Sequence, residues 1–301
     1  MLQLRTTAYF ALDRLRSKGE FPPKWNSPEE LESVTNHFMQ RFMDERMEAS
    51  RELGPGFHLL ELLDRVVRCE DQEYMDEPST DGEEKAAMVR ALDRMNDLTM
   101  IYRHQVELLE PTLVELSQER KGPVRVLELA AGSGGLAFAL AEHARNKGIR
   151  IEITASDIVP ESVEAGRRAA ADRGLAVDFK VVNAFDLSGI AGDAIDMVVV
   201  SQSLHHFTPG QLSLMIAGAG NLGASVFVGI DGHRSTLLLA GVPFVASLQG
   251  IAEFTGDAFT SARKFYSDIE LDIIAEIATG RRLHRVECSW PLSVLTVRTA
   301  T

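Results

Sequence analysis

The pattern of apolar positions changes near residue 122. Before it, apolar residues recur every three or four positions, which is typical of amphipathic helices. One such helix is predicted to begin at Ser27, because a proline and a capping-box glutamate follow it, and to end at residues 54–56, Gly-Pro-Gly. An acidic loop is expected at residues 70–84, and the helical pattern that follows it is predicted to be interrupted at Pro111. The first part of the chain is therefore expected to be helical.

After residue 122, short apolar runs alternate with helical segments. The runs predict seven strands, at residues 124–129, 150–156, 176–182, 195–201, 224–230, 283–289 and 292–298. Helices are predicted at 135–147 and 160–173, then one long proline-kinked helix after Asp231, and a last helix that a capping box opens at Ser267. This alternation predicts an α/β, Rossmann-like, doubly wound and mostly parallel sheet. We therefore predict two regions, residues 1–121 and residues 122–301.

Composition and charge narrow the possible functions. The chain has 301 residues, 45% of them hydrophobic, which is enough for a large core. Its net charge is −13, and Lys and Arg form no cluster of the kind that binds a phosphate backbone, so we expect no nucleic-acid partner. Cys69 and Cys288 are too few for a disulfide framework and lack metal-ligand spacing, so we expect a cytoplasmic protein without a metal. No apolar stretch reaches the length of a membrane span, so we expect a soluble chain.

The segment VRVLELAAGSGGLA, residues 124–137, indicates a cofactor site. A buried strand ends near Glu128, and a glycine-rich turn then leads into a helix, so that a ligand can lie against backbone N–H groups. Read from Gly132, the turn matches the dinucleotide pattern G-x-G-x-x-G/A. Read from Glu128, it resembles motif I of class I S-adenosylmethionine (SAM)-dependent methyltransferases. The Glu128 carboxylate would attract the ammonium and sulfonium of SAM but repel the two phosphates of a dinucleotide, which favours the second interpretation.

The resemblance to this methyltransferase family continues at the other strand ends. It implies that the cofactor is bound by Glu128, Ala130, Gly132, Gly134, Asp157, Ile158 and Ser201. The Ser201 backbone is expected beside the methionine part of SAM, and Asp157 is placed to accept both ribose hydroxyls. Asn183, Ala184 and Phe185 fall where the family contacts adenine, although Asp186 is an alternative to Asn183. The resemblance also implies an antiparallel last strand in the seven-stranded sheet. One departure from the motif is Ala130, which replaces the first glycine and should therefore keep a negative φ.

Candidate catalytic residues follow the fourth and fifth predicted strands. His205 and His206 resemble the Leu-His-His segment of the quinone-biosynthesis C-methyltransferase-like group, and either one could remove a proton from an acceptor. A neighbouring sulfonium would keep the imidazole neutral, as a base requires. Asp231 is a second candidate base, or else an N-cap. Methyl transfer can also run on proximity and alignment alone, so these alternatives stay open.

Four further residues are predicted to bind the substrate: Tyr102, Arg103, Arg263 and Tyr266. The resemblance implies that residues 1–121 cover a small-molecule acceptor or mediate a homodimer. It further implies methyl transfer to oxygen or carbon of a phenol, a quinone-like or a polyketide-like compound. Two alternatives remain: an NAD(P)-dependent oxidoreductase that uses the same glycine-rich loop, and a non-catalytic SAM-binding interaction module.

Overall fold

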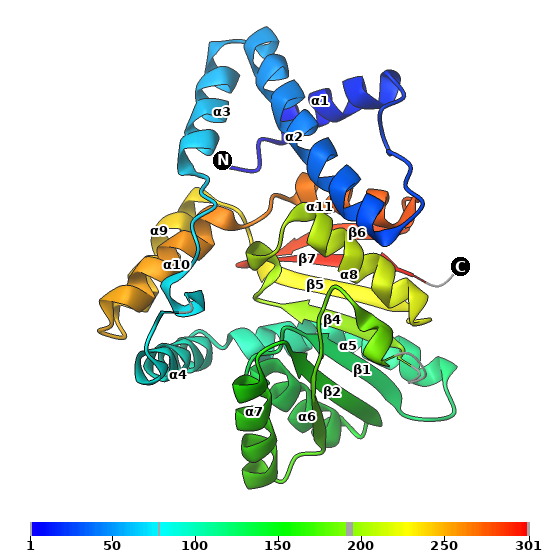
Figure 1. The fold of residues 1–301 in the computed structure, drawn as a ribbon, viewed down its shortest axis with the longest axis vertical. Helices are drawn as coiled ribbons and strands as arrows, with labels where there is room; N and C mark the ends of the chain where they lie inside the picture. Colours follow the sequence, from blue (N-terminus) through cyan, green and yellow to red (C-terminus); the bar gives the residue numbers. More distant parts are fainter. Residues whose placement is uncertain (1, 78, 191–194, 300–301) are drawn as a thin grey trace. The chain divides into compact units, whose positions relative to one another are not determined.

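The computed structural model describes residues 2–77, 79–190 and 195–299. Its seven strands form one sheet in the order β3-β2-β1-β4-β5-β7-β6, mostly parallel with the last strands antiparallel (Figure 1). The strands are β1 (Val124–Leu129), β2 (Ile151–Asp157), β3 (Val177–Val181), β4 (Met197–Ser201), β5 (Val226–Gly232), β6 (His284–Ser289) and β7 (Leu292–Arg298). The predicted doubly wound α/β fold with an antiparallel end is confirmed.

The chain forms two compact units, which we describe separately. Unit 1 comprises residues 1–95, 204–214 and 231–295, and unit 2 comprises residues 96–203, 215–230 and 296–301. These units cut across the predicted boundary at residue 121. The role of residues 1–121 as a substrate cover or dimerisation segment therefore stays a prediction.

Unit 2 contains the parallel part of the sheet. Its helices are α5 (Ile101–Glu119), α6 (Gly135–Lys147), α7 (Pro160–Arg173) and α8 (Pro209–Asn221), the last of which begins in unit 1. Every residue of β4 is buried, and so are five of the six in β1, as expected for strands covered on both faces. In register, Leu129 of β1 lies beside Val200 of β4, so the carboxyl ends of these strands are neighbours. Gly148 and Gly174 end α6 and α7 in the left-handed conformation that favours glycine.

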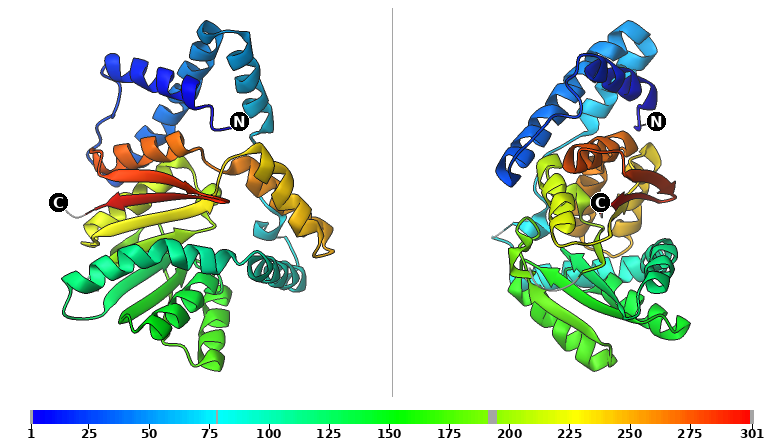
Figure 2. Two further views of the ribbon diagram at one scale, coloured as in Figure 1. Left: turned by 180° about the vertical axis from the view of Figure 1, so that it is seen from behind. Right: turned by 90° about the vertical axis from the view of Figure 1, so that its right-hand side faces the viewer.

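Unit 1 is built mainly from helices. They are α1 (Arg5–Ser17), α2 (Pro28–Leu53), α3 (Pro55–Val67), α4 (Gly82–Leu98, which runs into unit 2), α9 (Thr236–Ser247), α10 (Ala252–Lys264) and α11 (Asp268–Thr279). Figure 2 shows α9 and α10 side by side as a helical pair. The Ser27 side chain caps α2 as predicted, and Ser267 and Glu270 form the predicted capping box of α11.

A buried ion network joins α2, α3 and the segment after β5 in unit 1. Asp64 accepts hydrogen bonds from Arg46 at 2.7 Å and from Arg234 at 2.6 Å, and the side chains of all three are fully buried. Arg68 bridges Asp64 and Glu270. Burial alone would raise the pKa of Asp64, but the guanidinium groups of Arg68, Arg234 and Arg46 outweigh it and hold that pKa well below its usual value.

Two predictions about helices are corrected by the structure. Pro111 lies inside α5 and does not interrupt it; the helical pattern breaks instead at Met100, whose φ of 54° is left-handed. The segment after Asp231 forms two helices, α9 and α10, rather than one kinked helix. Within the described residues, no helix combines the length and the apolar character needed to cross a membrane.

Candidate functional site

The glycine-rich loop of unit 2 connects β1 to α6. Gly134 precedes α6 with a φ of 90°, and a Cβ there would lie 2.6 Å from the Phe179 ring, so both conformation and space require glycine. Gly132 also has a positive φ, of 55°, and its backbone N–H donates to Asp157 at 2.8 Å. The loop therefore places backbone without bulky side chains at the start of a helix, where a ligand can approach closely.

Glu128 lies at the carboxyl end of β1, buried in unit 2. Its Oε1 accepts a long hydrogen bond of 3.4 Å from the Ser201 hydroxyl, whereas its Oε2 is buried and has no hydrogen-bond partner. Burial, with a smaller contribution from the Asp157 carboxylate, raises the pKa of Glu128 to about 8, although the Ser201 hydroxyl and the nearby Ala137 backbone lower it in part. Without a ligand this carboxyl is thus mostly protonated at neutral pH, and a cation bound beside it would offset the desolvation of its ionised form.

Ala130 contradicts the sequence-based expectation of a negative φ. Its φ is 51°, in the left-handed region, which costs a residue with a Cβ about 1–2 kcal/mol. Gln202, just after β4, is also left-handed, with a φ of 53°. The Ser203 hydroxyl links the two turns by donating to the Ala130 carbonyl at 3.4 Å. Strained backbone at the ends of two neighbouring strands is typical of a ligand site.

Predicted ribose and adenine residues lie at the ends of β2 and β3. Asp157 accepts backbone N–H groups through both oxygens, from Gly132 at 2.8 Å and from Val159 at 2.9 Å, and each oxygen keeps a second lone pair for a hydroxyl. Beside it, Ile158 is 60% exposed. Asn183 is exposed, and its side-chain oxygen accepts the Phe185 N–H at 3.0 Å.

Tyr102 approaches the glycine-rich loop from α5. Asn96 donates a hydrogen bond to its hydroxyl at 2.9 Å, and a Cβ at Gly135 would collide with its ring and hydroxyl. The Tyr102 ring therefore packs directly on the loop. Arg103 has a side chain that is 75% exposed and pairs with Glu107 at 3.0 Å, an ordinary pair on the surface of a helix. Its contacts give the predicted substrate role no support.

A histidine and carboxylate cluster lies in unit 1. Asp231 Oδ2 accepts both the His205 backbone N–H at 2.9 Å and a bond from His205 Nδ1 at 2.8 Å. His205 Nε2 lies 3.5 Å from Glu73 Oε1, and this buried nitrogen has no hydrogen-bond partner. His206 Nε2 lies 3.8 Å from Glu73 Oε2, and its Nδ1 lies 3.2 Å from Asp76. Both predicted histidines and Asp231 are thus brought together, with Glu73 added.

The electrostatics of the cluster differ from the expectation of a neutral histidine. Burial alone would lower the pKa of His205, but the Asp231 and Glu73 carboxylates outweigh it and raise this pKa to about 10. Burial would raise the pKa values of Asp231 and Glu73, and the histidines lower both. In the ligand-free protein His205 is therefore an imidazolium at neutral pH, which cannot accept a proton.

Arg263 and Tyr266 both donate hydrogen bonds to backbone carbonyls of segments near this cluster. Tyr266 donates its hydroxyl to the Phe207 carbonyl at 2.6 Å, which holds the loop that carries both histidines. Burial raises the pKa of Tyr266 far above its usual value, so the hydroxyl keeps its proton. Arg263 donates to the Val67 carbonyl at 2.7 Å and lies over the Phe259 ring. These contacts are positioning contacts, and substrate binding by either side chain stays a prediction.

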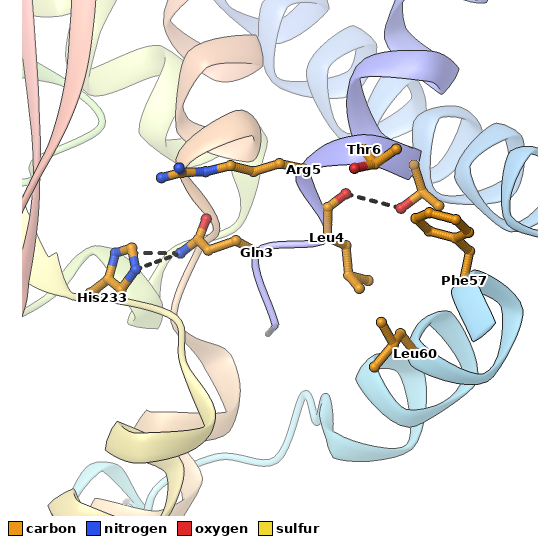
Figure 3. A pocket seen from close by; sticks show the side chains of 8 residues that line it. Gln3, Leu4, Arg5, Thr6, Phe57, Leu60 and His233 are labelled. Carbon is orange, nitrogen blue, oxygen red and sulfur yellow. Dashed lines mark hydrogen bonds between the residues drawn. The ribbon is translucent and has the colours of Figure 1, made fainter. Parts of the chain in front are cut away.

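A separate cavity in unit 1 is lined by the N-terminal segment, α3 and His233. Its volume is about 400 Å³, and Gln3 points across it towards His233 (Figure 3). It contains none of the predicted site residues. We therefore do not assign it to the cofactor or the acceptor.

The family comparison agrees with the geometry of unit 2. Residues 126–222 match the family described as methyltransferase domain. This segment is therefore similar to a methyltransferase domain. It runs from β1 through the glycine-rich loop, Asp157, Asn183 and Ser201 to the end of α8. The buried, unpaired Glu128 Oε2 and the open backbone of the loop fit a cofactor that carries an ammonium group.

Individual proteins extend the comparison of the methyltransferase domain. An uncharacterised protein of Mycobacterium tuberculosis is 29% identical over 125 residues, 42% of this chain and 43% of that protein. The demethylmenaquinone methyltransferase of Thermus thermophilus is 34% identical over 114 residues, 36% of this chain and 49% of that enzyme. The chain thus spans less than half the length of both relatives. The solved structure of the plantazolicin methyltransferase BpumL in complex with S-adenosylhomocysteine (SAH) has a TM-score of 0.56 at 10% identity, and covers 78% of this chain and 95% of that one. At this identity it shows the shared fold.

Glu73 and Ser203 were not predicted from the sequence. Glu73 lies in the acidic segment at residues 70–84, which by composition is typical of a solvated loop, yet its side chain is only 4% exposed. Asp257 fixes this segment by accepting the backbone N–H groups of Tyr74 and Met75 at 2.6 and 2.9 Å. The signal for burial in this acidic segment is its Tyr74-Met75 pair, which stands between Glu73 and Asp76.

Proposed function

We propose that this chain transfers a methyl group from SAM to oxygen or carbon of a small-molecule acceptor, of phenolic, quinone-like or polyketide-like type. The demethylmenaquinone methyltransferase among the relatives favours a quinone-like ring as the first acceptor to try. The proposal concerns the whole chain, whereas the family match concerns residues 126–222.

The observation that carries this proposal is the unpaired Oε2 of Glu128. It lies next to a loop that contains three glycines, and burial holds the pKa of its carboxyl near 8 without a ligand. An ammonium group at this position would pair with the ionised carboxylate and lower that pKa, whereas a diphosphate would gain no charge pairing and would oppose ionisation of the carboxyl. The site therefore favours SAM over a dinucleotide.

The other predicted cofactor residues complete the site within unit 2. Asp157 keeps lone pairs for two ribose hydroxyls, and the exposed Ile158 offers an apolar surface beside them. Near adenine, the Asn183 amide donates while its oxygen is held by the Phe185 N–H. Tyr102 closes the loop on the side of α5. Each of these assignments is part of the proposal.

We assign the acceptor to the cluster that follows β4. His205 comes four residues after Ser201 in the sequence, directly after the strand whose end the proposal assigns to the methionine part of the cofactor. His206 has a side chain that is 26% exposed and is the accessible member, while His205 is held between two carboxylates. Asp231 orients His205 through its Nδ1.

The reaction is a displacement in which the protein's main contribution is alignment. SAM supplies an electrophilic methyl group on a sulfonium; the acceptor atom forms the new bond to carbon, and the electron pair of the broken bond stays on sulfur in SAH. The acceptor loses one proton, which either His206 accepts or water carries away. Holding the two reactants in line provides most of the rate acceleration in such a transfer.

An assay with isotopically labelled SAM tests the proposal. The protein is incubated with a panel of phenols, quinols and polyketide-like compounds, and labelled products are detected by mass spectrometry. We expect at least one methylated product, with SAH formed in equal amount, and a large loss of turnover in the His206→Ala variant. SAH binding without a product from any acceptor would instead favour the non-catalytic module.

A further inference from the structure

The cluster in unit 1 has the composition and spacing of a metal centre. Glu73, His205 and His206 each offer one ligand atom, and the three atoms lie within 4.8 Å of one another. We propose that these three side chains bind one divalent transition-metal ion, with Zn²⁺ as the preferred ion and one coordination position left open. Two histidines and one glutamate are the donor set of zinc sites that keep a position for water or substrate.

The distances fit coordination better than direct hydrogen bonding. Two ligands of a tetrahedral Zn²⁺, each about 2.0–2.1 Å from the ion, lie about 3.3 Å apart. His205 Nε2 lies 3.5 Å from Glu73 Oε1, and His206 Nε2 lies 3.8 Å from Glu73 Oε2. A direct N–H···O bond is shorter, at 2.7–3.2 Å. The two gaps, one to each Glu73 oxygen, are thus longer than hydrogen bonds and slightly wider than the spacing of tetrahedral zinc ligands, so a small movement of the side chains would close them around an ion.

The buried Nε2 of His205 is an independent observation. The His205 side chain is only 7% exposed, and this nitrogen makes no hydrogen bond although it faces Glu73. Unpaired buried polar atoms in native proteins are uncommon and usually have a ligand or a water as their partner. A metal ion at this point would satisfy the nitrogen and the glutamate together.

Both histidines are oriented in the way that metal-binding histidines are. Asp231 bonds Nδ1 of His205 at 2.8 Å, and Asp76 lies 3.2 Å from Nδ1 of His206, so that each imidazole has a carboxylate on one nitrogen and Glu73 facing the other. A carboxylate on the far nitrogen fixes the ring and makes the near nitrogen a better ligand. The Ser261 hydroxyl orients the Glu73 carboxylate by donating a hydrogen bond to its Oε1 at 2.8 Å.

The charges around the cluster favour a cation. Glu73, Asp76 and Asp231 bring three carboxylates, against one ammonium, that of Lys264, whose Nζ lies 3.8 Å from Glu73 Oε1. This distance is too long for a hydrogen bond, and the flexible lysine stem can withdraw when an ion binds. The three carboxylates outnumber the Lys264 ammonium and the His205 imidazolium, and an entering ion would displace the proton that His205 carries on Nε2.

The open position suggests a task at the acceptor. A hydroxyl or enol oxygen bound there loses its proton more easily, because the ion stabilises the resulting anion. This task rests on the proposed methyl transfer, whereas the metal site itself rests only on the cluster. The two claims can therefore fail separately.

Titration of the chelator-stripped protein with Co²⁺ tests the site without measuring activity. We expect one Co²⁺ per chain, a visible absorption band of the kind that histidine ligands and low coordination number produce, and displacement by one equivalent of Zn²⁺. The His206→Ala variant should bind Zn²⁺ at least 100-fold more weakly. Asp231→Asn should lose about 10- to 100-fold by disturbing the orientation of His205.

The controls separate ligand loss from misfolding. His143→Ala removes a histidine that also lies beside a glutamate, Glu110, at 3.1 Å but outside the cluster, and should leave Zn²⁺ affinity unchanged. Circular dichroism checks the fold of each variant, and His206 is exposed enough to replace even if the Glu73→Gln variant does not fold. Zn²⁺ affinity that is equal in wild type and His206→Ala, or absent in both, overturns the inference. If SAH still binds in that case, the proposed function is unaffected.

Discussion

Replacing Glu128 with glutamine removes the charge that we assign to the ammonium of SAM. The substitution keeps the shape of the side chain, and the Ser201 hydroxyl can still donate to the amide oxygen. A hydrogen bond to a charged group contributes about 1.5–3 kcal/mol, so we expect SAH to bind the variant about 10- to 150-fold more weakly. Isothermal titration calorimetry measures this loss directly.

The pH dependence of SAH binding provides a sharper version of the same test. With a pKa of about 8 in the free protein, about one Glu128 in a hundred is ionised at pH 6 and about half at pH 8. SAH affinity in the wild type should therefore rise by up to about 50-fold between these two values. In Glu128→Gln the rise should disappear, and in Glu142→Gln, a change at an exposed glutamate of α6, it should remain.

The stability of the ligand-free protein should change in the opposite sense. The folded pKa of Glu128 lies above its unfolded value of about 4.5, so the unfolded state binds fewer protons between pH 4.5 and 8, and stability falls as pH rises through this range. Relative to Glu128→Gln, the wild type should lose about 1.4 kcal/mol per pH unit there at most. A wild type whose SAH affinity is independent of pH, and whose stability follows that of the variant, refutes the assignment.

Three further predictions concern the backbone and the core. Ala130→Gly relieves a left-handed alanine and should raise the free energy of unfolding by up to about 1 kcal/mol in urea. The control Ala131→Gly should lower it by about 0.5–1 kcal/mol. Equal losses of stability at both positions would exclude strain at residue 130. Asp64→Asn should lower the free energy of unfolding by about 3–5 kcal/mol, because it leaves buried guanidinium groups without their carboxylate. A loss below about 1 kcal/mol would show that the network is solvated. Gly135→Ala should destabilise the protein, because the new methyl group collides with Tyr102. Adding Tyr102→Ala should recover part of that lost stability. Strictly additive effects in this double-mutant cycle would show that the two residues do not touch.

Most of the fold could be predicted because local patterns agree with it. The strand at 124–129 and the helix at 160–173 have the predicted limits, since an unbroken apolar run and a proline-to-glycine helix frame are strong local signals. The capping box at Ser267 was equally clear. The predicted break at Pro111 is wrong, because a proline can stay inside a helix when the chain on both sides packs well. The break at Met100 has no comparable signal in the sequence.

The candidate site could be predicted only in part. The residues at the strand ends followed from the rule that ligands bind at the carboxyl edge of a parallel sheet, and the structure places Glu128, Ser201 and Asp157 there. Glu73 could not be predicted in the same way, because it comes from a helical region more than a hundred residues before His205 and is brought to it by tertiary folding alone. The left-handed φ of Ala130 likewise depends on the turn around it, and the residue type argues against it.

Calorimetric titration of the wild-type protein with SAH and, separately, with NAD⁺ tests the central claim most directly. The account predicts saturable binding of one SAH per chain and no measurable binding of NAD⁺, because an ammonium beside the glycine-rich loop pairs with the ionised form of Glu128, whereas a diphosphate finds no such partner there. Saturable binding of NAD⁺ without any heat from SAH would contradict it.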